Sequence, residues 1–78
     1  MENKKPNERW KALVLQLKQT AKEKGINQNE IAQKLNMPQG NVARFFSHQF
    51  RPGLELFINI ANVVGKEIKL EDIENFKH

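Results

Sequence analysis

The sequence predicts an all-α fold, a compact bundle of four to five helices around one small core. Apolar residues recur at spacings of three and four in four successive segments, which is the spacing of one face of an α-helix. Glycine, asparagine or proline separates these segments and marks where helices are expected to begin and end. With 78 residues, the chain is expected to form one domain.

The first helix is expected from Glu8 to about Lys24, after a flexible basic arm at residues 1–7. Its inner stripe is predicted to be Trp10, Leu13, Leu17 and Ala21, flanked by Val14 and Thr20. Gly25 follows the last periodic residue. It is expected to cap the helix, because glycine adopts positive φ without steric cost.

A helix-turn-helix unit is predicted over residues 28–46. Its first helix is expected from Gln28 to Leu35, with Asn27 as N-cap and Glu30 in a variant of the capping box. Asn36 stands at the bend, where it tolerates the positive φ of a sharp reversal.

The second helix of this unit is expected to begin with Pro38 in its first turn and to end near Phe46 or Ser47. Ala32 is the small side chain that would let the two helices cross closely, and Val42 and Phe45 would face inward. The outer face would then point away from the domain, as in helices that enter the major groove of DNA.

A fourth helix is expected from Pro52 to about Val64, capped by Gly65, after a loop over residues 47–53. This helix is apolar almost all round, so a second surface is expected to cover what the core cannot. The domain is therefore expected to span residues 8–65, and residues 66–78 form a tail.

The tail has two interpretations. Strict alternation over residues 67–71 favours a short strand at 66–71, whereas Leu70, Ile73 and Phe76 would equally form a helical stripe. Either form could cover the fourth helix, within the chain or across a dimer. The predicted dimerisation residues are Leu56, Val63, Ile68, Leu70, Ile73 and Phe76.

Positive charge is concentrated in the N-terminal two thirds of the chain. The net charge is +4, and by region it is +4 over residues 1–25, +2 over 26–53 and −2 over 54–78. This distribution favours a polyanionic partner near the predicted helix-turn-helix unit.

Several classes of function have no support in the sequence. There is no cysteine, and no signal-like or membrane-spanning apolar run, so a cytoplasmic protein without membrane association is expected. His48 and His78 lack ligand spacing, and the acidic residues of the tail lack a nucleophile or base partner. We therefore expect no catalytic residues, no metal and no cofactor.

An ordered set of residues resembles the lambda-repressor-like, Cro-type (XRE) helix-turn-helix family over residues 10–65. The resemblance implies a bundle of four or five helices that binds specific DNA sequences in transcription control, normally as a dimer. The residues that carry it are Gln28, Ile31-Ala32, Leu35, Val42, the stretch RFFSHQFRP, Ile60-Ala61 and Val64-Gly65.

The resemblance also implies the roles of individual residues. Gln28 would touch a DNA phosphate and brace Gln39, which would open the recognition helix. The predicted base-contacting residues are Gln39, Gly40, Asn41, Ala43 and Arg44. The predicted phosphate-contacting residues are Asn27, Gln28, Ser47 and Arg51.

Side-chain chemistry agrees with those roles. Gln39 can make a bidentate contact to adenine, and Arg44 can donate to guanine O6 and N7 or to a phosphate. Gly40 and Ala43 are small enough to let the helix approach the bases closely, and Ala43 could touch a thymine methyl. Phe46 and Phe50 are expected to pack within the loop rather than to stack on bases.

The sequence departs from the family pattern at two loop positions. His48 stands where glycine usually follows the recognition helix, which suggests a strained or different loop, and Phe50 replaces a frequent polar DNA contact. The chain is interpreted as a DNA-binding regulator, most simply a repressor, that binds a short palindromic operator as a dimer. Two alternatives remain at this stage: an antitoxin that also neutralises a toxin partner, and a protein-interaction module that has lost DNA binding.

Overall fold

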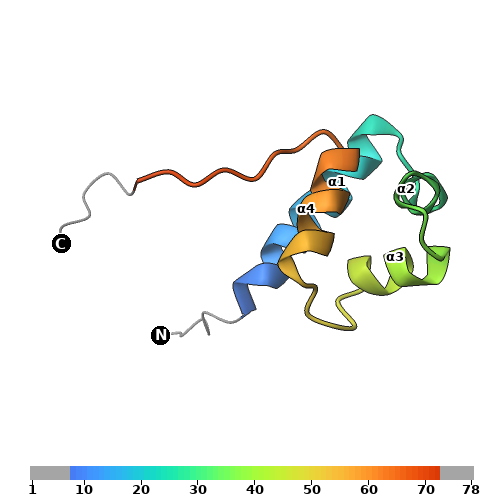
Figure 1. The fold of residues 1–78 in the computed structure, drawn as a ribbon, viewed down its shortest axis with the longest axis horizontal. Coiled ribbons are helices and arrows are strands. Elements are labelled where there is room, and N and C mark those ends of the chain that lie inside the picture. The colour runs from blue at the N-terminus through green and yellow to red at the C-terminus, as the bar shows by residue number, and fades with distance from the viewer. Residues whose placement is uncertain (1–7, 73–78) are drawn as a thin grey trace.

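Four helices follow one another along the part of the chain that the structure, a computed structural model, describes, residues 8–72. They are α1 (Arg9–Lys24), α2 (Gln28–Leu35), α3 (Gln39–Phe46) and α4 (Leu54–Val63) (Figure 1). No strand forms within these residues. The predicted all-α bundle is confirmed.

The helix ends follow the local sequence closely. The Oδ1 atom of Asn27 accepts a hydrogen bond of 2.8 Å from the backbone N–H of Glu30, which caps α2 at its N-terminus. At the C-termini, Gly25 with φ 72° and Asn36 with φ 56° adopt the left-handed conformation, as predicted. Gly65, with φ 84°, does the same just after α4.

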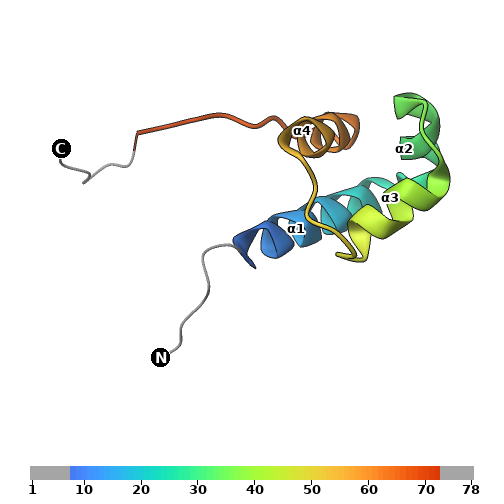
Figure 2. The ribbon, with the colours of Figure 1, turned by 60° about the horizontal axis from the view of Figure 1, so that its bottom comes forward.

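The helices enclose one apolar core. α2 packs against α3 and α4, and α1 packs against the same two helices (Figures 1 and 2). Phe45 lies at the centre, with its ring centroid 5.0 Å from that of Phe46 and 6.2 Å from that of Phe57. The buried residues are Val14, Leu17, Ala21, Ile31, Ala32, Val42, Phe45, Phe46, Ile60, Ala61 and Val64.

Two predictions about the core were wrong. Leu13 is 47 % exposed, whereas its neighbour Val14 is fully buried. Both residues lie at helical spacing from Leu17, so periodicity alone could not tell which of them is buried. The packing of the neighbouring helices against α1 determines that Val14 is buried and Leu13 is exposed. Phe46 belongs to the core and not to the loop, because α3 keeps its helical geometry through that residue.

Pro38 and Pro52 lie just before α3 and α4 rather than within them. Pro38 is the N-cap of α3, with extended backbone at φ −62° and ψ 141°. Pro52 comes two residues before α4, whose N-cap is Gly53. The fixed φ of proline fits an extended N-cap as well as a first helical turn, so the sequence could not distinguish these positions.

The core covers more of α4 than predicted. Leu56 and Val63, both predicted dimerisation residues, are half-buried and pack against the core cluster. The large apolar side chain that α4 leaves exposed is Leu54, at 71 %. Most of the exposed apolar surface therefore lies outside α4.

The tail is extended and unpaired. Residues 66–72 form neither helix nor strand, and they run away from the four helices in both ribbon views (Figures 1 and 2). Of the predicted dimerisation residues in this tail, Ile68 is 42 % exposed and Leu70 is 99 % exposed. Ile73 and Phe76 lie outside the described residues.

Candidate nucleic-acid interface

The outer face of α3 carries the predicted base-contacting residues. Gln39, Gly40 and Arg44 are exposed, and Asn41 and Ala43 are half-buried. The opposite side of the same helix is buried through Val42, Phe45 and Phe46. This division follows from helical periodicity, because the inner residues recur at spacings of three and four while the exposed residues fall between them.

The side chain of Arg44 runs along the surface of α3 toward the N-terminus of the helix. Its guanidinium donates a short hydrogen bond to the Oδ1 atom of Asn41, one helical turn earlier. A Cβ atom built on Gly40 would lie 3.7 Å from the Nη1 atom of Arg44. The charged group thus lies beside the first turn of α3, next to the smallest side chain on that face.

A surface depression of about 620 Å³ lies where α1, α2 and α3 meet. Gln28 of α2 and Gln39 of α3 both line it, so the fold brings together the two residues that the sequence analysis paired. Its apolar wall includes Ile31 and Phe46. A second depression, of about 560 Å³, continues from Gln39 along the bend between α2 and α3.

Two lysines of α1 line the larger depression and were missed by the sequence analysis. Lys18 and Lys22 are exposed and lie one helical turn apart, so their ammonium groups can reach the same side of α1. Each directly follows a buried residue of the α1 stripe, Leu17 or Ala21. This spacing was visible in the sequence, but only the packing of α1 beside α2 and α3 connects it with the recognition helix.

The predicted phosphate-contacting residues differ in how their polar atoms are used. Asn27 caps α2 through Oδ1, so a contact to a phosphate would have to come from the amide nitrogen of its side chain. The hydroxyl of Ser47 donates to the carbonyl of Ala43 at 2.9 Å, so it must turn before it could donate to a phosphate. Arg51 is exposed in the loop before α4.

His48 gives the loop after α3 the shape that a glycine would allow. Its φ is 63°, in the left-handed region. Nε2 lies 3.1 Å from the carbonyl oxygen of Lys11, to which it donates, and the imidazole meets the ring of Trp10 edge-on at 5.8 Å. These contacts tie the loop to the start of α1, so the loop keeps its turn without glycine. Phe50 is 37 % exposed in the same loop.

Two negative observations apply to residues 8–72. No three His, Cys, Asp or Glu side chains gather closely enough there to hold a metal ion. No helix in that part of the chain has the length and hydropathy needed to span a membrane.

Comparison with known proteins gives one match. A family model described as helix-turn-helix matches residues 17–70, which includes the second half of α1 and all of α2, α3 and α4. No curated protein and no solved structure matches the chain.

Proposed function

The chain belongs to the lambda-repressor-like (XRE) helix-turn-helix family of DNA-binding transcription regulators, and we propose that it represses transcription by binding a short palindromic operator as a dimer. The observation that carries the proposal is the exposure of Gln39, Gly40 and Arg44 on α3, opposite a fully buried inner face. An α-helix presented in this way fits the major groove of B-DNA. Bound there, the protein would block access of polymerase to the promoter.

Base contacts would come from the first turn and the middle of α3. The amide of Gln39 can pair with adenine N6 and N7, and the guanidinium of Arg44 can donate to guanine O6 and N7. Gly40 lies between them without a side chain, which would allow the helix axis to come close to the base edges. Ala43 offers a methyl group for a thymine contact.

Contacts to the phosphate backbone of DNA would flank the outer face of α3. Lys18 and Lys22 share a depression with Gln28 and Gln39, so their ammonium groups are placed to meet a phosphate beside the groove. Arg51, exposed in the loop before α4, offers a further cationic group for a phosphate. Such phosphate contacts would fix the orientation of α3 in the groove.

The test is selection from a random-sequence duplex library, followed by mobility shifts of the selected site at several salt concentrations. Arg44→Ala is expected to weaken the selected site by about 1–3 kcal/mol and to relax the preference at one base pair. Gln39→Ala is expected to relax the preference at a neighbouring base pair. Lys34→Ala, which removes an exposed cation from α2 away from both depressions, is the matched control and should change neither.

A dimer predicts a selected site with two half-sites about one helical turn, roughly 34 Å, apart. Binding with a steep salt dependence but no selected sequence would contradict the proposal and leave only non-specific attachment. No binding to any duplex would favour the alternative of a protein-interaction module.

A further inference from the structure

We propose that the larger depression, where α1, α2 and α3 meet, binds a small amphipathic anion, an apolar body that carries one carboxylate, and that this ligand releases the protein from DNA. The binding site stands on the structure alone, whereas the release of DNA rests on the proposed function. The depression measures about 620 Å³, a size typical of small-molecule sites. Its lining combines an apolar floor with two ammonium groups, and each of these features restricts the chemistry of the ligand.

The floor of the depression is apolar. Behind it lie Ala21, Ile31 and Phe46, which belong to the core and are almost fully buried. Ile26 is half-buried, so it supplies apolar surface that a ligand would touch, together with the methylene stems of the lining lysines. The backbone N–H of Ile26 donates to the carbonyl of Ala21 at 2.9 Å, which fixes the position of this residue. Covering such a surface requires an apolar group, which a phosphate does not have.

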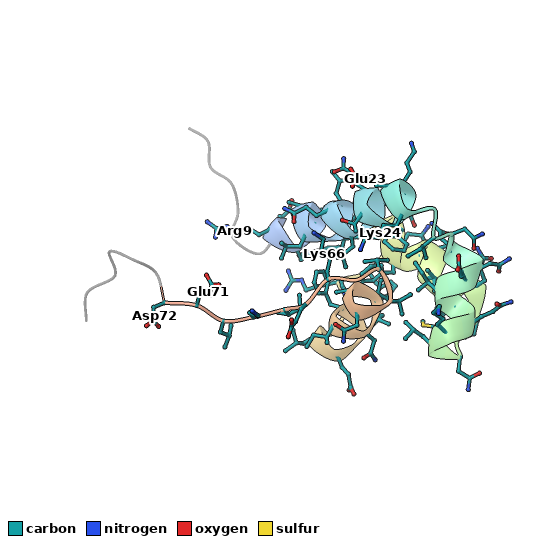
Figure 3. All side chains as sticks on the ribbon, turned by 90° about the horizontal axis from the view of Figure 1, so that it is seen from above. Arg9, Glu23, Lys24, Lys66, Glu71 and Asp72 are labelled. Atoms are coloured by element: carbon teal, nitrogen blue, oxygen red, sulfur yellow. The ribbon has the colours of Figure 1, made fainter. Side chains whose placement is uncertain are left out.

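The charged groups at the rim of the depression are all cationic. Lys18 and Lys22 lie one helical turn apart on α1, so both ammonium groups can reach the two oxygens of one carboxylate. Within the described residues, neither ammonium has an ion-pair or hydrogen-bond partner. Glu23, which follows Lys22, does not line the depression. Figure 3 shows Glu23 and Lys24 at the end of α1, with Lys24 pointing toward α4 and Glu23 away from it. The charge at the rim therefore selects an anion.

The surroundings of the depression favour a free small molecule over a membrane or a protein surface. Docking surfaces of those two kinds carry large exposed apolar side chains. In the part of the chain that the structure describes, such side chains are Leu13, Leu15, Phe50, Leu54, Ile68 and Leu70. None of them lines the depression. The apolar surface is confined to the hollow and suits an occupant that fits inside it.

A ligand in this depression would occupy positions that DNA needs. Lys18 and Lys22, the proposed phosphate contacts, would be neutralised by its carboxylate. Gln28 and Gln39 line the same depression, so its apolar body would lie beside the first turn of the recognition helix. Ligand and DNA would then compete, and by linkage each would lower the affinity for the other by the same factor.

The first experiment tests the site without DNA. Octanoate is titrated into the protein and backbone amide shifts are followed by two-dimensional NMR. Saturable shifts are expected around Lys18, Lys22 and Ile26, with a dissociation constant of about 0.1–10 mM for a probe of this size. Acetate, which lacks the apolar body, should bind about tenfold more weakly or less. Octylammonium, which has the same chain and the opposite charge, should not shift these residues.

Variants separate the contributions of charge and apolar surface to octanoate binding. Lys18→Gln and Lys22→Gln are each expected to weaken it about three- to fivefold, the range of an exposed ion pair. The matched control is Lys34→Gln, because this exposed cation of α2 lies outside the depression. Ile26→Ala is expected to weaken binding by a similar factor. Its control is Val63→Ala, which shortens a half-buried apolar side chain of α4 away from the depression.

The second experiment tests the release of DNA. Octanoate is added to the complex with the selected operator at constant ionic strength, and fluorescence anisotropy measures the apparent dissociation constant for DNA. That constant is expected to rise in proportion to octanoate above its own dissociation constant, whereas equal concentrations of acetate should leave it unchanged.

Two results would overturn the site: no saturable shifts with octanoate, or equal binding of octylammonium. Saturable octanoate binding that leaves the affinity for DNA unchanged would overturn the release. A protein that bound no operator would contradict the proposed function, and the titration without DNA would still decide whether the depression binds the anion.

Discussion

Replacing Gly65 by alanine is expected to destabilise the protein by about 2–3 kcal/mol. Gly65 has φ 84°, and a residue with a Cβ in the left-handed region costs about 1–2 kcal/mol. The added Cβ would also lie 2.4 Å from the Nζ atom of Lys24. That ammonium donates a hydrogen bond of 3.0 Å to the carbonyl of Val64, which closes the end of α4 against α1.

The second part of the cost comes from displacing Lys24. Its side chain is flexible and can move away, but the hydrogen bond to Val64 is then lost, at a cost of about 0.5–1.5 kcal/mol. For a domain of this size the total corresponds to a fall in melting temperature of roughly 10–20 °C. Thermal and urea unfolding followed by circular dichroism would measure it.

A double-mutant cycle with Lys24→Met separates the two contributions. In the Lys24→Met background, Gly65→Ala should cost only the backbone term of about 1–2 kcal/mol. Gly40→Ala is the control. A Cβ added at Gly40 would make only an ordinary van der Waals contact, and the backbone φ there is not positive, so this variant should leave the free energy of unfolding unchanged or raise it. An equal cost of Gly65→Ala in both backgrounds would refute the role assigned to Lys24, and a cost below about 0.5 kcal/mol would refute the backbone argument too.

Three further predictions concern single residues. Asn27→Ala should lower the unfolding free energy by about 1 kcal/mol through loss of the α2 cap, and Asn27→Asp or Ser should recover most of it in urea titrations. His48→Ala should be less stable than His48→Gly by about 1 kcal/mol. Both variants lose the contacts to Lys11 and Trp10, but only alanine has a Cβ that is strained at positive φ, so the reverse order would show that no strain is present. Gly40→Ala should weaken operator binding in mobility shifts while leaving thermal stability intact, and unchanged affinity would show that close approach at this position is not needed.

The sequence predicted those parts of the fold that depend on local chemistry. Asn27, Gly25 and Asn36 mark helix ends because only a few residue types can cap a helix or adopt positive φ. Their roles were therefore visible without any tertiary information. The bracing of Gln39 by Gln28 was implied by the resemblance; the two residues line one depression, and a contact between them stays a prediction.

What the sequence could not predict depends on how helices pack. Leu13 and Val14 are both apolar and adjacent, and only the placement of the neighbouring helices decides which one is buried. Lys18 and Lys22 look like ordinary exposed lysines until α1 is placed beside the recognition helix. His48 looked like a departure from the expected turn, but contacts to Lys11 and Trp10 hold it in the conformation that glycine would adopt.

The hydrogen bond between Arg44 and Asn41 makes a further prediction about specificity. A guanidinium has five N–H donors, and the Oδ1 atom of Asn41 occupies one of them. Arg44 can therefore keep this bond while it donates to guanine, in which case Asn41 positions Arg44 and does not contact a base of its own. Asn41→Ala and Arg44→Ala should then relax the preference at the same base pair. The double variant should bind the selected site no more weakly than Arg44→Ala alone. Relaxation at two different base pairs, with additive losses, would show instead that the two side chains contact bases independently.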